Sequence, residues 1–318
     1  MKKLSSVLVL VVLLIQSIAF VGCGKKDAAE GFPEKNIEMI VPFGAGGGTD
    51  TVGRTLANSM EKYIGKPVVV NNRTGGSGAV GMTTGAKAKA DGYTLTVVTR
   101  EIVSLPLMGL AQIKSDDFDL LALINLEPAI ILVKDDSKYK TAKDLFDDAR
   151  ENPGKVKMAS TAKPNFYVLG IEIDQDIKFN HVPFNGAAEA IPAVLGGHTD
   201  FTIVTPGEAI SQIKSGQLRP IGLMDSERYP ELKDVPTLKE QGFDITSGTW
   251  RGIGVPKGTP DEIKQKLSEA IDKAVNDPQF KSIMAKSNTS IRYMNAEEFT
   301  NFVKKDEKTI QKIVDALN

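Results

Sequence analysis

The chain has 318 residues, and its 39 Lys and Arg nearly balance its 40 Asp and Glu. A near-neutral chain lacks the basic excess of nucleic-acid-binding proteins, so no nucleic-acid partner is expected. The single cysteine excludes an internal disulfide, and the roughly 285 residues beyond the N-terminal segment are enough for two domains.

The N-terminus has the pattern of a secretory signal. A basic start at residues 1–3 is followed by an apolar run over residues 7–20, which ends at Gly22 and Cys23. This pattern predicts a lipoprotein signal peptide over residues 1–22, lipidation of Cys23 and a tether over residues 23–32. The protein would then be extracytoplasmic and lipid-anchored to a bacterial membrane. The alternative is an ordinary signal peptide with an incidental cysteine.

Strand and helix signals alternate along the rest of the chain, which predicts an α/β fold. Apolar runs predict strands at 37–41, 67–70, 93–99, 120–124, 129–133, 156–159, 179–182, 201–204 and 220–223. Helical spacing of apolar residues predicts helices at 52–64, 79–90, 187–195 and at the C-terminus. Two further helices are expected to begin with Thr141 and Thr259 as N-caps.

The most informative segment is the glycine loop that follows the first strand, at residues 44–48. Backbone N–H groups in such a loop lie at the positive end of a helix dipole and form a seat for a carboxylate or a phosphate. A dinucleotide-binding fingerprint needs a third glycine where the chain has Thr49, and no Gly-Lys-Ser/Thr closes a P-loop. Nucleotide binding is therefore disfavoured. The glycines could also serve only to form a turn.

Signals for catalysis and metal binding are weak. His181 and His198 are the only histidines, and no Cys or carboxylate cluster lies at ligand spacing around either. Ser77 lacks the flanking glycine pattern of a nucleophile elbow. The sequence therefore predicts a binding protein with no metal and no cofactor, and not an enzyme.

Four separated blocks carry a family resemblance, in the order that the family has them. They are residues 40–50 (IVPFGAGGGTD), 68–78 (VVVNNRTGGSG) with 91–95 (DGYTL), 181–188 (HVPFNGAA) with 195–197 (LGG), and 235–242 (VPTLKEQG) with 250–252 (WRG) and 256–260 (PKGTP). Through them the chain resembles the substrate-binding proteins of tripartite tricarboxylate transporters, the TctC/Bug-type extracytoplasmic receptors.

The resemblance implies a periplasmic-binding-protein-like fold of type II, with two α/β domains joined by two crossing strands around a ligand cleft. Domain 1 would hold residues 33–125 plus 250–318, and domain 2 residues 126–249. The implied function is capture of a small organic carboxylate and its delivery to the membrane subunits of a transporter, by a protein that acts as a monomer. The alternatives are a receptor that signals to a membrane partner and a secreted enzyme acting on a carboxylate.

In this family the loop after the first strand holds a ligand carboxylate, partly through ordered water. Carried over by position, the resemblance implies ligand-binding roles for Phe43, Gly44, Ala45, Gly46, Gly47, Gly48, Thr49, Asp50, Thr99, Ser160, Thr161, Phe184, Asn185, Gly186 and Thr205. Asp50 is expected to brace the loop or cap the helix rather than touch the anion.

Some of these side chains have alternative roles. Phe43 and Phe184 could be ordinary core residues. Trp250 is expected to pack at the hinge, and Arg100 and Arg251 could either meet a second carboxylate or lie at the surface.

The chain departs from the family at residues 159–166, where ASTAKPNF replaces the usual Gly/Ser-rich turn. That turn helps to select the ligand in the family. Lys163 and Phe166 are therefore expected to give this cleft an unusual selectivity.

Overall fold

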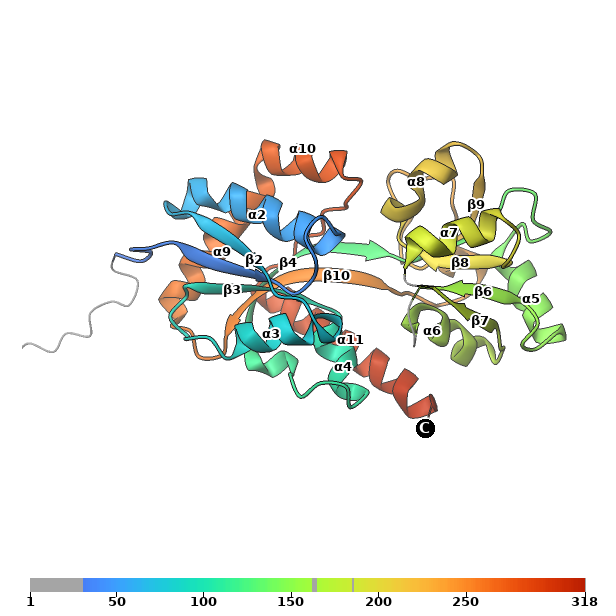
Figure 1. The fold of residues 1–318 in the computed structure, drawn as a ribbon, viewed down its shortest axis with the longest axis horizontal. Coiled ribbons are helices and arrows are strands. Elements are labelled where there is room, and N and C mark those ends of the chain that lie inside the picture. Colours follow the sequence, from blue (N-terminus) through green and yellow to red (C-terminus); the bar gives the residue numbers. More distant parts are fainter. Residues whose placement is uncertain (1–30, 162–164, 185, 318) are drawn as a thin grey trace, which may run out of the picture.

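The computed structural model describes residues 31–161, 165–184 and 186–317, which form two α/β lobes (Figure 1). The expected signal peptide, Cys23 and nearly all of the expected tether lie outside these described residues. In the described ranges, no helix is both long and apolar enough to cross a membrane.

The first lobe is built on a five-stranded sheet in the order β2-β1-β3-β10-β4. Its strands are β1 (Ile37–Val41), β2 (Val68–Asn72), β3 (Thr94–Thr99), β4 (Phe118–Pro128) and β10 (Gly248–Pro256). β1 pairs in parallel with β2 and β3, whereas β10 runs antiparallel to β3 and β4. Because β1, β2 and β3 are parallel, the loops that follow them lie at one edge of the sheet.

Helices cover both faces of this sheet. One apolar core joins it to α2 (Gly48–Ile64), α9 (Asp261–Asn276) and α10 (Pro278–Lys286). A second core, on the other face, includes α3 (Ala79–Ala86), α4 (Glu101–Leu107) and α11 (Ala296–Leu317). The central strand β1 is thus buried between helices on both sides, which explains its nearly continuous apolar sequence.

The second lobe repeats this plan with the strand order β7-β6-β8-β5-β9. Its strands are β5 (Ile130–Lys134), β6 (Lys157–Ser160), β7 (Asn180–Pro183), β8 (Phe201–Val204) and β9 (Leu218–Leu223). Its helices are α5 (Ala142–Glu151), α6 (Phe166–Gln175), α7 (Ala187–Leu195) and α8 (Pro206–Lys214). α5 and α6 pack on one face and α7 and α8 on the other, so β6, β7 and β8 again bring their following loops to one edge.

Two strands cross between the lobes, as Figure 1 shows for β4 and β10. β4 ends at Pro128 and β5 begins two residues later, while β10 begins at Gly248, which pairs with Pro128. A Cβ at Gly248 would lie 2.3 Å from the backbone oxygen of Glu127, so this close approach requires glycine. The arrangement agrees with the expected pair of α/β domains joined by crossing strands. Boundaries at 125/126 and 249/250 stay a prediction.

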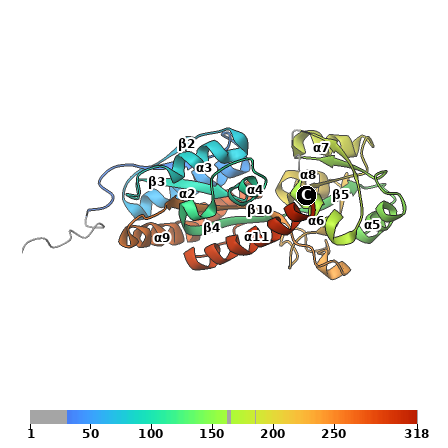
Figure 2. The same ribbon diagram turned by 90° about the horizontal axis from the view of Figure 1, so that it is seen from below.

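α11 forms a further contact between the lobes. It runs along the first lobe and ends beside α6 in both Figure 1 and Figure 2. A Cβ on Gly170 of α6 would lie 3.7 Å from Cδ1 of Ile313 in α11. Phe166, at the start of α6, packs against the same apolar cluster as α11. The cleft between the lobes is therefore bordered by α11 as well as by the crossing strands.

Several local predictions differ from the structure, and β4, for example, extends well beyond the predicted strand at 120–124. α3 ends at Ala86 rather than at residue 90. The expected cap at Thr259 is wrong, because its hydroxyl donates to the Pro256 oxygen at 2.8 Å and Pro260 occupies the N-cap position. α4 was not predicted, since a seven-residue helix containing Pro106 is too short to give a periodic signal. The capping box at Thr141 is confirmed by reciprocal hydrogen bonds with Asp144.

Candidate ligand-binding cleft

The glycine loop connects β1 to α2 at the edge of the first sheet that faces the second lobe (Figure 1). Gly44, Ala45, Gly46, Gly47 and Gly48 are all exposed. α2 begins at Gly48, and its N-cap Gly47 supplies no side-chain hydrogen bond to the helix. Among the described residues, the first N–H groups of this 17-residue helix therefore have no capping partner. They present the partial positive charge of the helix to the solvent.

Asp50 braces this loop, as expected from the sequence. Its Oδ2 accepts hydrogen bonds from the Gly46 N–H at 3.0 Å and from Nε of Arg54 at 3.2 Å. Its Oδ1 accepts from Arg54 at 2.7 Å and from Nδ2 of Asn72 at 2.8 Å. Burial raises the pKa of Asp50, but these hydrogen bonds outweigh it and hold the pKa below its usual value. The carboxylate is thus ionised and fully engaged with the protein.

A second network ties the loop to both crossing strands. Nε of Arg251, in β10, donates to the Thr49 hydroxyl at 3.1 Å. The same guanidinium donates to Oε2 of Glu127, in β4, at 2.7 Å and also to Oδ1 of Asn125. Arg251 and Glu127 are both buried, with side-chain exposures of 11% and 7%. The expectation of a surface position for Arg251 is therefore wrong, since its charge is balanced inside the hinge region.

The predicted residues of the second lobe follow three parallel strands. Ser160 and Thr161 come at the end of β6, and the Phe184 N–H donates to the Ser160 oxygen at 2.9 Å. Gly186 has a φ of 129° at the N-cap of α7. Thr205 caps α8 through a reciprocal capping box with Glu208. Asn185 lies outside the described residues.

A cavity of about 760 Å³ lies between the lobes. From the first lobe it is lined by Ser77, by the crossing-strand residues Gly248 and Thr249, and by the α4 segment from Arg100 to Leu110. From the second lobe it is lined by Thr161, Asn165, Phe166, Tyr167, Pro183 and Phe184.

Thr161 and Phe184 are the predicted ligand-binding residues that line this cavity. The described lining does not include Phe43, Gly44, Ala45, Gly46, Gly47, Gly48, Thr49, Asp50, Thr99, Ser160, Gly186 or Thr205. Phe43 lies close by, because a Cβ at Gly78 would be 3.0 Å from its ring and Gly78 adjoins the lining residue Ser77. Phe43, which directly precedes the glycine loop, therefore lies near the cavity without lining it. Ligand binding at all these positions stays a prediction.

Sequence reasoning missed the contribution of α4. Arg100 and Glu101 directly follow Thr99, which was already placed at the cleft end of its strand. Arg100 was already named as a possible contact for a second carboxylate. The rule that ligands meet the carboxyl ends of strands applies equally to the residues just beyond them, and would have selected Glu101 as well. Ser104, one helical turn further on, shares the cavity.

Arg100 is buried rather than exposed, and its charge is already balanced. Its Nε and one terminal nitrogen donate to the two carboxylate oxygens of Asp306 in α11, at 3.2 and 3.1 Å. Its other terminal nitrogen donates to the Ser247 hydroxyl and to the Gly248 oxygen, both at 3.1 Å. Trp250 also donates to Asp306, at 2.8 Å, and packs edge-on against Phe299. Both Arg100 and Trp250 therefore fix the hinge to α11.

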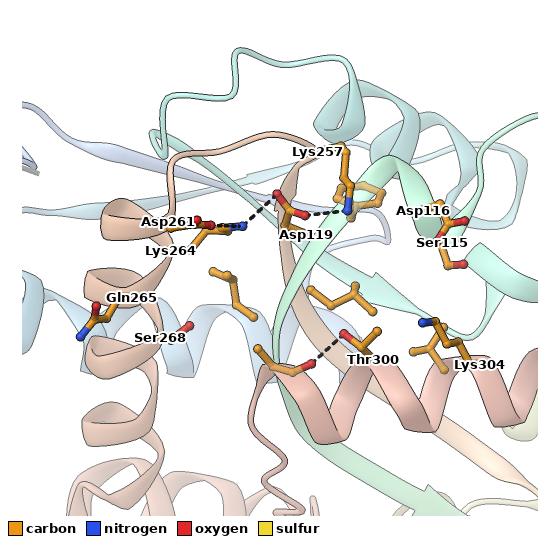
Figure 3. Close-up of a pocket in the computed structure, with 15 residues that line it drawn as sticks. Ser115, Asp116, Asp119, Lys257, Asp261, Lys264, Gln265, Ser268, Thr300 and Lys304 are labelled. Carbon is orange, nitrogen blue, oxygen red and sulfur yellow. Dashed lines mark hydrogen bonds and ion pairs between the residues drawn. The ribbon is translucent and has the colours of Figure 1, made fainter. Parts of the chain in front are cut away.

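Another cavity, of about 450 Å³, lies away from the predicted residues, between the start of β4, α9 and α11 (Figure 3). Asp119 pairs there with Lys257 at 2.9 Å and Lys264 at 3.5 Å, and Lys264 also pairs with Asp261 at 2.8 Å. Burial raises the pKa of Asp119, but Lys257, the Gly258 N–H and Lys264 together lower it. The charges in this cavity compensate one another.

Within the parts of the chain that the structure describes, no three His, Cys, Asp or Glu side chains gather closely enough to hold a metal ion.

Comparison with known proteins places these features in a family. The family model described as "Tripartite tricarboxylate transporter family receptor" (TctC) matches residues 52–318. A relative from Cupriavidus necator, the "UPF0065 protein in gbd 5'region", is 33% identical over 295 residues, which are 90% of this chain and 89% of the relative.

Solved structures show the same fold. A TctC solute-binding protein from Polaromonas has 32% identity and a TM-score of 0.83, covering 90% of this chain and 99% of its own. The periplasmic binding protein BugD has 27% identity and a TM-score of 0.73, covering 90% and 98%. The predicted periplasmic-binding-protein-like fold is thereby confirmed.

Two more distant structures of this fold contain ligands. MatC from Rhodopseudomonas palustris, with bound malate, has 24% identity and a TM-score of 0.72 and covers 89% of this chain and 100% of its own. An R. palustris protein with adipate has 22% identity and a TM-score of 0.74 and covers 89% and 98%.

Proposed function

This chain belongs to the TctC family of tripartite tricarboxylate transporter receptors, and on that premise we propose that it captures a small organic carboxylate and delivers it to the membrane subunits of a tripartite transporter. Proteins of this family are extracytoplasmic solute-binding receptors and not enzymes. The proposed mechanism is accordingly binding and closure of the two lobes, with no bond made or broken.

The uncapped start of α2 is the observation that carries this proposal. Its exposed glycine loop offers backbone N–H groups at the positive end of a helix. The carboxylate of Asp50 already accepts hydrogen bonds from Gly46 and Arg54, so it braces the loop without occupying the proposed seat. A carboxylate would supply the missing cap. The malate and adipate bound by two proteins of the same fold are ligands of this class.

We assign the seat to Phe43, Gly44, Ala45, Gly46, Gly47, Gly48, Thr49 and Asp50. The opposing side would come from Thr99, Ser160, Thr161, Phe184, Asn185, Gly186 and Thr205. Closure would bring the second group toward the first by rotation about β4 and β10, with domain boundaries at 125/126 and 249/250.

Substitution of Gly44 tests the seat without disturbing the fold. A Cβ at Gly44 meets no atom within 4 Å, so Gly44→Leu places a side chain in open space over the loop. We expect the stabilisation of the protein by carboxylates in a thermal-shift assay to be lost, because a bound ligand stabilises by RT ln(1 + [L]/Kd). Lys89→Leu, at an exposed position away from the loop, is the control. Unchanged stabilisation of Gly44→Leu would refute the seat.

We further propose that the receptor is a monomer tethered to the membrane through lipid on Cys23. A fatty chain on a flexible tether would keep the binding lobes near the transporter. Wild type should partition with membranes and Cys23→Ala should be released in soluble form. Light scattering of the released protein should give the mass of one chain.

A further inference from the structure

The charge of the inter-lobe cavity is unusual for a site that would bind an anion. Of the lining residues that the structure describes, two carry charge, Arg100 and Glu101. Arg100 is neutralised by Asp306, and the two side chains are only 10% and 13% exposed. The positive charge therefore faces α11 and the crossing strand, and contributes little to the cavity.

Glu101 has no such compensation. Its Oε2 accepts a hydrogen bond from the Thr99 hydroxyl, which fixes the side chain at the end of β3. No Lys, Arg or His among the described residues forms an ion pair with it. The carboxylate is partly buried on the cavity wall, so within the described ranges the wall carries one negative charge with no paired cation.

Tyr167 lies across the cavity from Glu101, at the start of α6. Burial raises the pKa of its hydroxyl, Arg100 opposes the rise, and Glu208 and Glu101 add to it. The phenol therefore stays protonated and uncharged, and it does not balance the charge of Glu101.

The rest of the described lining mixes large apolar side chains with polar residues (Ser77, Ser104, Thr161, Asn165 and Thr249). Of the apolar ones, Leu105 comes from α4 and Met108 directly follows that helix, and Phe166 and Phe184 come from the second lobe. A ligand body of aliphatic or aromatic carbon would remove water from these surfaces, at about 25 cal/mol per Å² buried. A second carboxylate in the same space would lose hydration and meet Glu101.

We propose that Glu101 selects ligands that carry one carboxylate, an apolar body and a protonated amino group, with the ammonium donating to Oε1 of Glu101. This inference rests on the proposed carboxylate seat at the start of α2 and adds the second recognition point. The ligand class is then an amphipathic amino acid, and di- and tricarboxylates are rejected.

Matched acids test this selectivity. The first set is 6-aminohexanoate, hexanoate and adipate, which share a six-carbon chain and differ at one end. The second set is 3-amino-3-phenylpropanoate, 3-phenylpropanoate and phenylsuccinate, which differ only in the group on the carbon that bears the ring. Titration calorimetry of the full two-lobed protein with each acid should show the amino acid binding at least about tenfold more tightly than the dicarboxylate in one set or both.

Variants of Glu101 identify the cause. Glu101→Gln keeps the acceptor for Thr99 and should reduce the preference for the amino acid at least about fivefold, while Glu101→Lys should favour adipate or phenylsuccinate. Asp116→Asn, at the separate cavity of Figure 3, should change neither preference. Thermal unfolding shows that each variant is folded.

Two results would overturn the proposal. One is a dicarboxylate that binds wild type as tightly as the matching amino acid in both sets, and the other is an amino-acid preference that Glu101→Gln leaves intact. In either case binding of acids that Gly44→Leu abolishes would still support the proposed function. Absence of binding by every acid would instead overturn the carboxylate seat, and this inference with it.

Discussion

The loop at residues 43–48 and the wall formed by Thr161, Phe166 and Phe184 lie on opposite lobes and are held by different contacts. The loop offers mainly backbone groups, and charged side chains hold it in place. Asp50 accepts a hydrogen bond from the Gly46 N–H, and Arg251 connects Thr49 to Glu127. The wall consists of side chains that project from strand ends and from the start of a helix. Backbone donors recognise any carboxylate, whereas side chains can change from protein to protein. The loop is therefore suited to recognise the ligand class, and the side chains of the cavity walls, Glu101 of the first lobe included, to select within it.

The largest expected effect on the free energy of unfolding comes from removing the guanidinium of Arg251, which connects the loop to the crossing strands. Arg251→Ala leaves Glu127 buried without its partner, which should lower the free energy of unfolding by about 3–5 kcal/mol. Urea unfolding measures this. The control is Arg228→Ala, whose ion pair with Glu240 is half-exposed on both sides and should contribute no more than about 1 kcal/mol. Equal effects of the two substitutions would mean that the loop does not depend on the buried pair.

A smaller effect is expected from removing the brace itself. Asp50→Ala deprives the Gly46 N–H, Arg54 and Asn72 of a charged acceptor, at a cost of about 1.5–3 kcal/mol in unfolding free energy. Affinity should fall by a similar factor for every acid tested, because the proposed seat would contact only the carboxylate that all the acids share. Calorimetry over the acids gives the comparison. A loss confined to one acid would show that the loop also selects among ligands.

The opposite pattern is expected in the second lobe. Phe184→Ala removes part of an apolar, half-buried wall and should weaken ligands with bulky carbon bodies by about 1 kcal/mol. Acids with a small carbon body should bind almost unchanged. The same calorimetric series measures this, with Ile173→Ala, exposed near the C-terminal end of α6 and absent from the cavity lining, as the control. Uniform weakening across all acids would remove the distinction between the two walls.

Features encoded within a few neighbouring residues could be predicted from the sequence. The apolar strand before the loop, the glycines and the role of Asp50 are of this kind, because all lie between Ile37 and Arg54. The network of Arg251 with Thr49 and Glu127 could not be predicted, since Arg251 is more than a hundred residues from each partner and meets Glu127 only through the pairing of β4 and β10.

The position of Arg100 shows the same limit. Arginine is usually exposed, and nothing local indicates that Asp306 of the C-terminal helix will meet it. Long-range ion pairs of this type depend on how the helices pack, which hydrophobic periodicity does not specify. The cavity wall at α4 was missed for a related reason, because α4 is too short to show a period.

The smallest expected effect is on the pH dependence of the Tm. Measuring it in each lobe tests whether the two lobes unfold together. In the second lobe, hydrogen bonds from Lys138, Tyr139 and Asn152 lower the pKa of Asp148 to about 2. In the first lobe, Tyr63, Lys62 and the Gln279 N–H lower the pKa of Asp277 to about 2. A carboxylate with a depressed folded pKa contributes stability that is fully present above its unfolded pKa of about 3.9 and is lost as the pH falls toward 2.

Asp148→Asn and Asp277→Asn should therefore each lower the Tm at pH 7 and make it less sensitive to pH between about 4 and 2 than in wild type. Asp244→Asn, at an exposed position, is the control. Because β4, β10 and α11 tie the lobes together, we expect both variants to shift one common transition in calorimetry. Two transitions, one moved by each variant, would show instead that the lobes unfold independently, and that the hinge network orients the loop without coupling the lobes.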